Sequence, residues 1–224
     1  MGGRPVDEGL HSAVEHLGPN GGLRAVGPRE GAHIARISGL TVRGTVERLV
    51  AAGLDSLPGG GAGRLVEDVR RRISPAKPSA AEWIEVMHEA HMLHLPTSAT
   101  MRYGHVETPR QRIDHLLAIR DLQARCPEGN CGFLAFIPWI FRSTGTRLEQ
   151  EGVRTHFSPL EYVRVIAASR LILCNIRNIQ ASWLTVGKAT AQLSLHSGAN
   201  DMGSLMIEEN VVSSAGPRNE VDAE

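Results

Sequence analysis

The sequence predicts an α/β fold built on a parallel sheet, and more narrowly an incomplete (β/α) TIM-type barrel. Short strand candidates alternate with helices of about ten to sixteen residues, which is the pattern of right-handed βαβ units. Residues 133–139 form a nearly continuous apolar run, which favours a strand buried on both faces. A complete eightfold barrel takes about 250 residues. This chain has 224 residues, and its strand count is short of eight by roughly one or two.

Apolar spacing and capping residues place the elements in order. Ser79 precedes Glu82 by three residues, as a capping box requires, and Ser158 precedes Pro159, a fitting N-cap and N1 pair. The expected helices cover residues 8–17, 32–37, 42–52, 79–93, 108–124, 158–173, 188–195 and 204–215. The expected strands cover residues 23–26, 54–58, 97–103, 133–139 and 179–184, with 198–201 as a loop or very short strand.

Composition narrows the class of protein. Hydrophobic residues make up 42% and charged residues 21%, which is ordinary for a soluble globular protein. Lys+Arg and Asp+Glu are equal at 24 each, so the chain carries no long-range field that would gather nucleic acid or an anionic membrane. With no secretory signal at the N-terminus and no apolar run of spanning length, a cytoplasmic protein is expected. We expect one domain over residues 1–216 and a polar tail over 217–224.

The chain has three cysteines, Cys126, Cys131 and Cys174, which limit the metal sites that it can form through thiolates. Their spacing fits neither a structural zinc site nor a cluster held by three closely spaced thiolates. His88, His91 and His94 drift around a helix at their spacing of three, so a metal site is not expected there either. The sequence therefore predicts no metal ligands in this chain.

Six motifs occur in an order that resembles a known family. They are Leu57-Pro58-Gly59-Gly60-Gly61-Ala62, Ala99-Thr100-Met101-Arg102-Tyr103-Gly104-His105-Val106-Glu107-Thr108, Phe136-Ile137-Pro138-Trp139, Asn178-Ile179-Gln180-Ala181-Ser182-Trp183, Gly198-Ala199-Asn200-Asp201-Met202-Gly203-Ser204 and Glu208-Glu209-Asn210-Val211-Val212. Together they resemble the radical S-adenosylmethionine enzymes of the futalosine route to menaquinone. The fourth and sixth motifs favour cyclic dehypoxanthinyl futalosine synthase over its relatives, aminofutalosine synthase and the FO synthase subunit.

The resemblance implies S-adenosylmethionine and a [4Fe–4S] cluster as cofactors, and a nucleoside-type small molecule as the substrate. It implies that an adenosyl radical cyclises dehypoxanthinyl futalosine. Gly2 and Gly3 resemble the end of the family's second barrel strand, so the first strand and the CxxxCxxC cluster loop have no counterpart in this sequence. We therefore expect a truncated chain that does not turn over. It also departs from the family at Gly63, where a Glu is usual, and at Arg24, where a His is usual.

The motifs carry the candidate site residues, since a parallel barrel places its active site at the carboxyl ends of its strands. His105 and Glu107 are candidates to bind a ribose or relay a proton, with helix capping as the alternative. The candidate cofactor-binding residues are Gly2, Gly3, Gly59, Gly60 and Gly61. The candidate substrate-binding residues are Trp139, Gln180, Ser182, Asn200 and Asp201, with packing or Asx turns as alternatives. The run Arg70-Arg71-Arg72 is expected to be a solvated helix end.

Three hypotheses follow for the function. The chain belongs to a menaquinone-route radical enzyme, or it is a binding remnant that keeps nucleoside or S-adenosylmethionine affinity, or it folds poorly because sheet edges are left open. No observation in the sequence fixes the oligomeric state.

Overall fold

The fold is centred on a small parallel sheet. The computed structural model describes residues 26–63, 65–155 and 157–203. Its strands β1 (Thr97–Tyr103), β2 (Phe133–Ile140) and β3 (Asn178–Ile179) are parallel and lie in the order β1-β2-β3. Parallel bridges add Leu57 beside Thr97 and Asp201 beside Gln180. Five chain segments thus lie side by side in sequence order, which confirms the parallel α/β prediction; the incomplete barrel stays a prediction.

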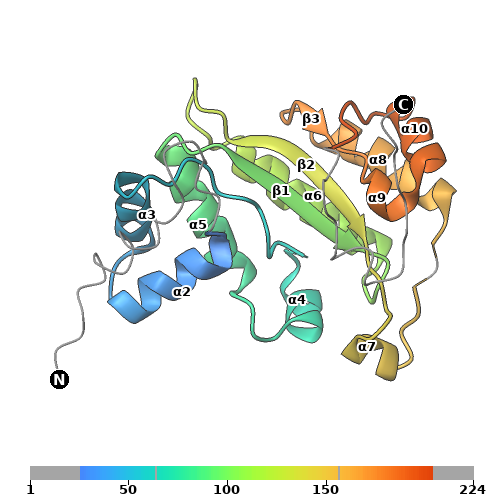
Figure 1. The fold of residues 1–224 in the computed structure, drawn as a ribbon, viewed down its shortest axis with the longest axis horizontal. Coiled ribbons are helices and arrows are strands. Elements are labelled where there is room, and N and C mark those ends of the chain that lie inside the picture. The colour runs from blue at the N-terminus through green and yellow to red at the C-terminus, as the bar shows by residue number, and fades with distance from the viewer. Residues whose placement is uncertain (1–25, 64, 156, 204–224) are drawn as a thin grey trace, which may run out of the picture.

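The helices that the structure describes connect and cover these strands. In Figure 1, α6 and α8 lie behind the sheet, while α2 and α3 pack against α5 at the amino-terminal side. No described helix is both long enough and apolar enough to cross a membrane. The bounds are α2 (Pro28–Ser38), α3 (Val42–Ala51), α4 (Glu67–Ile73), α5 (Ala80–Met92), α6 (Pro109–Gln123), α7 (Arg147–Gln150), α8 (Pro159–Ile172), α9 (Trp183–Val186) and α10 (Lys188–Leu195).

The capping residues act as the sequence predicts. The Ser79 hydroxyl accepts from the Glu82 amide, and the Glu82 carboxylate accepts from the Ser79 amide, which completes the capping box of α5. Ser158 caps α8 ahead of Pro159. Local hydrogen-bonding chemistry therefore sets these helix starts.

The burial of β2 corrects one expectation. Strand β2 exists where it was expected, but Leu134 is 49% exposed and Trp139 is 39% exposed, so the strand is not buried on both faces. The register pairs Ala99 with Phe136 and Met101 with Pro138 on the face toward α6 and α8. The opposite face, which we call the inner face, carries Arg102 beside Trp139 at its carboxyl end.

Other expectations fail locally. The strand expected over residues 179–184 ends early, because Trp183 already begins α9 and Ser182 is its N-cap. The strand expected over residues 54–58 is reduced to the bridge at Leu57, and α4 was not expected as a separate helix. The expected helices 8–17 and 204–215, the strand 23–26 and the tail 217–224 lie outside the described residues.

Candidate functional site

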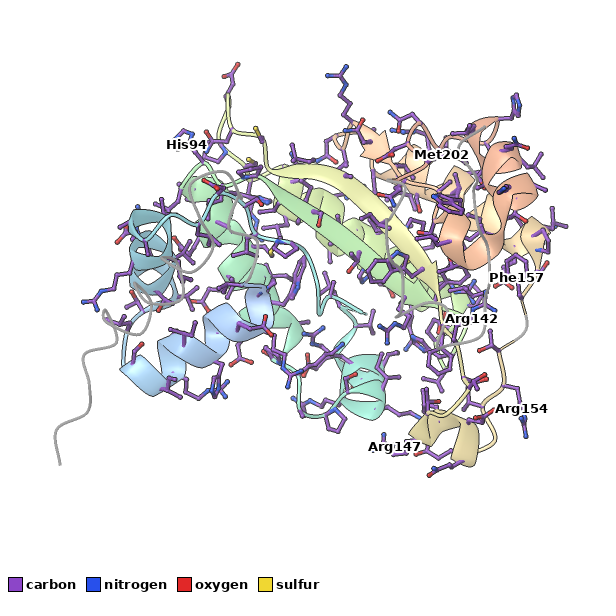
Figure 2. The ribbon with its side chains drawn as sticks, viewed as in Figure 1. His94, Arg142, Arg147, Arg154, Phe157 and Met202 are labelled. Carbon is purple, nitrogen blue, oxygen red and sulfur yellow. The ribbon has the colours of Figure 1, made fainter. Side chains whose placement is uncertain are left out.

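The candidate site lies where the parallel segments end. The Gly59–Gly61 loop follows the segment at Leu57, His105 follows β1, Trp139 is the last residue but one of β2, and Ser182 follows β3. Figure 2 shows Arg142, just past β2, beside the arrow tips of the strands. The carboxyl ends of parallel strands meet at one edge, so segments far apart in sequence converge there.

The Gly59–Gly61 loop is held firmly against β1. The Gly59 amide donates to the Ser98 hydroxyl at 3.0 Å, and the Gly59 carbonyl accepts from the Thr100 hydroxyl at 3.0 Å. An ideal Cβ at Gly59 would lie 1.8 Å from the Ser98 carbonyl oxygen, so only glycine fits. A Cβ at Gly60 or at Gly61 would meet no atom within 4 Å, and Gly61 has φ +80°. The backbone is therefore open to a ligand at Gly60 and Gly61, while Gly59 serves packing.

Arg70 fixes this loop from the other side, which corrects its expected place on a solvated helix end. Its side chain is 2% exposed, in contrast to the exposed Arg71 and Arg72. The guanidinium donates to the Gly61 carbonyl at 2.9 Å and the Ala62 carbonyl at 2.7 Å, and also to the Pro78 carbonyl. A charged donor to three carbonyls positions the Gly-rich loop.

His105 and Glu107 form a buried pair in the β1–α6 loop. Both side chains are 0% exposed, and the His105 Nδ1 lies 2.7 Å from Glu107 Oε2. The Glu107 carboxylate also accepts from the Gly104 amide at 2.6 Å and from Arg112 Nε at 2.8 Å. The His105 Nδ1 also accepts from the Val106 amide at 2.7 Å, and His105 Nε2 is a buried atom without a hydrogen-bond partner among the described residues.

These contacts revise the predicted roles of the pair. Glu107 does not cap α6, because Thr108 and Gln111 do. Since both side chains are covered, direct contact with a ligand requires the β1–α6 loop to open. The observed geometry supports a positioning role for Glu107, which holds the loop and the imidazole.

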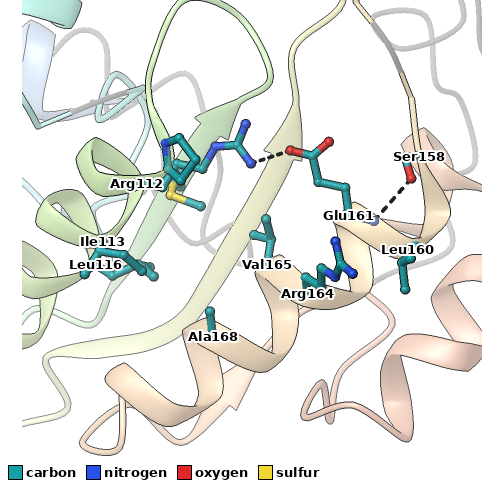
Figure 3. A pocket seen from close by; sticks show the side chains of 11 residues that line it. Arg112, Ile113, Leu116, Ser158, Leu160, Glu161, Arg164, Val165 and Ala168 are labelled. Carbon is teal, nitrogen blue, oxygen red and sulfur yellow. Dashed lines mark hydrogen bonds and ion pairs between the residues drawn. The ribbon is translucent and has the colours of Figure 1, made fainter.

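A cavity of about 450 Å³ lies between α6 and α8, on the helix side of the sheet. Figure 3 shows Arg112 pointing toward Glu161, and their ion pair spans 2.5 Å. The remaining walls are mostly apolar, including Ile113, Leu116 and Val165. This cavity is separated from the inner face by the sheet itself, so it is not the site that the motifs predict.

Trp139 and Gln180 do lie on the inner face. Trp139 is paired in register with Arg102, and its side chain is 39% exposed. The Gln180 amide nitrogen lies against Gly203, where a Cβ would approach it to 2.4 Å. Trp139 therefore offers an open aromatic surface at the strand end, and Gln180 flanks the neighbouring loop.

The side chains of Ser182 and Asn200 make hydrogen bonds within the fold. The Ser182 hydroxyl donates to the Pro138 carbonyl at 3.2 Å and is buried, so it does not share a strand face with Gln180. The Asn200 side-chain oxygen accepts from the Ile179 amide and Arg170. Its amide nitrogen donates to the Arg177 carbonyl. These contacts support structural roles for both residues, and the predicted ligand contacts stay predictions.

Asp201 uses one carboxylate oxygen in an Asx-type turn. Its Oδ1 accepts from the Gly203 amide at 2.7 Å, and its backbone carbonyl accepts from the Ala181 amide. The side chain is half-buried at the edge of the sheet. Gly2 and Gly3 lie outside the described residues, so their predicted role stays a prediction.

The cysteines do not fit an iron–sulfur cluster. Cys126 and Cys131 lie between α6 and β2, and Cys174 lies between α8 and β3. All three therefore precede strands, at the opposite edge from the candidate site. The part of the chain that the structure describes holds no group of three His, Cys, Asp or Glu side chains able to bind a metal ion. These residues therefore do not fit the cluster that the resemblance implies.

Sequence reasoning missed two cations near the strand ends. Arg142 follows β2, donates to the Thr185 carbonyl and lies 6.0 Å from the Phe157 ring centroid. Burial lowers its pKa. Lys77, before α5, is half-buried beside the Gly-rich loop. The position of Arg142 just after a strand was the only available signal, because the burial of a lone Lys or Arg has no local pattern.

Known proteins resemble this chain over nearly all of its length. Cyclic dehypoxanthine futalosine synthase of Streptomyces coelicolor is 43% identical over 224 aligned residues, which cover 97% of this chain and 54% of the relative. A 5-amino-6-(D-ribitylamino)uracil–L-tyrosine 4-hydroxyphenyl transferase of Methanosarcina mazei is 41% identical over 93% of this chain and 56% of its own length. Aminodeoxyfutalosine synthase of Thermus thermophilus is 41% identical over 82% of this chain and 49% of its own length.

The chain thus spans about half the length of the curated relatives it matches. A family model described as the CofH/MqnC C-terminal region matches residues 130–224, which include β2, β3 and the helices around them. The resemblance that the motifs predict is confirmed: this chain is similar to futalosine synthases and to their transferase relatives, and its residues 130–224 match the CofH/MqnC C-terminal region.

Proposed function

We propose that the chain supplies the ligand-binding part of a radical S-adenosylmethionine enzyme that cyclises dehypoxanthine futalosine. The 43% identity to a cyclic dehypoxanthine futalosine synthase over 97% of this chain carries the proposal. A second synthase of that name, from Halalkalibacterium halodurans, is 41% identical over 91% of the chain. The convergence of Gly60, Gly61 and Trp139 at one sheet edge supports it.

The chain's own residues have distinct tasks in this proposal. In such enzymes S-adenosylmethionine supplies the radical, and the protein orients two ligands and excludes water. The exposed backbone at Gly60 and Gly61 approaches the cofactor, with Arg70 holding the loop in place. Trp139 stacks on a flat ring of the nucleoside, and the His105–Glu107 pair shapes the loop beside it.

The role of Trp139 gives a prediction. Base stacking on an aromatic side chain is worth about 1–3 kcal/mol per base by alanine substitution. Trp139→Ala should therefore weaken nucleoside binding roughly 5- to 150-fold. Trp83 and Trp183 are buried, so ligand-induced quenching of tryptophan emission reports mainly on Trp139. Titration with dehypoxanthine futalosine measures both the affinity and the quench.

Leu134→Ala is the matched control, because Leu134 is also exposed on β2 but lies near the opposite end of the strand. It should leave the affinity unchanged. Equal affinity in Trp139→Ala and the parent chain, with native circular dichroism, would show that Trp139 does not touch the ligand.

The relatives leave a second candidate function. The Methanosarcina mazei transferase is 41% identical over 93% of this chain, nearly as similar as the first synthase. An alternative is therefore transfer of a tyrosine-derived group in the same kind of site, and another is a binding remnant without turnover. Comparing the binding of dehypoxanthine futalosine with the binding of 5-amino-6-(D-ribitylamino)uracil separates the proposed cyclisation from the group transfer.

A further inference from the structure

A second cavity, of about 820 Å³, lies between α2 and the loop that joins α4 to α5. The charged groups that line it are Arg29, Glu30, Arg36, Lys77 and Glu82, and His33 adds a titratable ring. This cavity plays no part in the site described above, although it lies close to the Gly-rich loop.

The two carboxylates of the cavity are already bound. Glu82 accepts from the Ser79 amide at 2.7 Å and pairs with Arg36 at 3.0 Å, and its pKa is lowered mainly by the Ser79 amide. Glu30 accepts from the Gly27 amide at 3.1 Å, at the start of α2. Among the residues that the structure describes, neither Arg29 nor the Lys77 ammonium has an ion-pair partner.

The Lys77 ammonium lies beside the backbone of Gly63. An ideal Cβ on Gly63 would be 3.9 Å from Lys77 Nζ, and the Gly63 carbonyl accepts from the Arg102 amide at 2.8 Å. Burial lowers the pKa of Lys77 to about 8, and the charges of Arg102, Arg70 and Arg29 act in the same direction. A half-buried ammonium that feels the charges of three arginines, with no ion-pair partner among the described residues, costs free energy, which a bound anion recovers.

We propose that Lys77 and Arg29 bind an oxyanion, the carboxylate or phosphate group of a small-molecule ligand, in the cavity beside Gly63. Lys77 supplies a point charge, and Arg29 supplies a planar fork that matches two oxygen atoms. The positive charges of Arg102 and Arg70 also attract an anion. Arg70 itself donates to backbone carbonyls and is not proposed to contact the anion.

The two-lysine composition makes a clean test possible. Lys77 and Lys188 are the lysines of the chain, and Lys188 is exposed at the start of α10. Reductive methylation with ¹³C-formaldehyde keeps their charge and gives one resolved NMR signal for each lysine besides that of the α-amino group. Lys77→Arg and Lys188→Arg assign the signals, and a pH titration of each signal gives its midpoint.

Phosphate and acetate are added separately, with chloride at equal ionic strength as the reference. An oxyanion beside Lys77 stabilises the charged ammonium, so the Lys77 midpoint should rise by about one unit, while the Lys188 midpoint stays unchanged. By linkage, the anion binds best below pH 8 and is released as the pH rises through the Lys77 midpoint. A larger shift with phosphate identifies a phosphate ligand, and a larger shift with acetate identifies a carboxylate ligand.

Two variants sharpen the result. Gly63→Glu places a carboxylate within reach of Lys77 and should abolish the effect of added anion; because Gly63 has φ +47°, circular dichroism must show that this variant folds. Arg29→Gln removes one of the two cations that bind the anion, without backbone strain. It should reduce the anion-induced shift of the Lys77 midpoint at least threefold. An unchanged Lys77 midpoint, or equal shifts at Lys77 and Lys188, would overturn the proposal. The test uses no enzymatic activity. The anion site can therefore be disproved while the proposed function stands, and the proposed function can be disproved while the anion site stands.

Discussion

Gly59→Ala should destabilise the chain by about 3 kcal/mol or more, among the largest effects expected of a single methyl group. The added Cβ would lie 1.8 Å from the Ser98 carbonyl oxygen, 2.6 Å from its carbon and 3.1 Å from the Ala99 Cα. These are backbone atoms of β1 and cannot move aside as a flexible side chain would. Relief requires the Gly-rich loop to separate from β1, which breaks the hydrogen bonds at Ser98 and Thr100.

Gly60→Ala is the matched control for this effect. No atom lies within 4 Å of the position that an alanine Cβ would take there, and the backbone of Gly60 is outside the left-handed region. We expect a change below about 1 kcal/mol. Urea denaturation followed by circular dichroism measures both variants, and similar midpoints for the two would contradict the close approach between the loop and β1.

Arg70→Met should cost about 2–4 kcal/mol, because it leaves three loop carbonyls without their charged donor. Methionine keeps much of the apolar stem, so the loss reports on hydrogen bonding more than on packing. The adjacent Arg71 is exposed and pairs with Glu67 one turn away, so Arg71→Met should cost less than about 0.5 kcal/mol.

The two arginines therefore give a direct comparison by urea denaturation. Arg70→Met should also loosen the Gly59–Gly61 loop, which faster amide hydrogen exchange at Gly61 and Ala62 would reveal. Equal stability of the two variants would mean that Arg70 is solvated, as the sequence suggests, and would remove the support we assign to the loop.

Local signals in this sequence carry most of the secondary structure. The helix expected over residues 188–195 matches α10, and the caps at Ser79 and Ser158 act as expected. The strand expected through Leu184 failed because Ser182 and Trp183 turn into a short helix. The contacts of Ser182 to Tyr162 and Pro138 come from other elements, and local propensity does not register them.

The candidate site was predictable at the level of segments and less so at the level of atoms. Strand ends indicated where His105, Trp139 and Gln180 converge. The burial of Arg70 depends on the Pro78 carbonyl, and the close approach at Gly59 depends on the Ser98 carbonyl. The local sequence does not contain these contacts, so it is equally compatible with a solvated helix end at Arg70 and a flexible turn at Gly59. Lys77 has no pattern around it that distinguishes a buried ammonium from an exposed one.

We propose that this chain holds ligand-binding residues of a radical S-adenosylmethionine enzyme and no ligands for its cluster. Cys126, Cys131 and Cys174 lie at the edge of the sheet away from Gly60 and Trp139, which motivates the claim. Anaerobic iron–sulfur reconstitution of this chain, with iron analysis and electron paramagnetic resonance, tests it most directly. We expect no stoichiometric cluster and no spectral response to S-adenosylmethionine. A stoichiometric cluster whose spectrum changes when S-adenosylmethionine is added would contradict it, because these cysteines would then be cluster ligands.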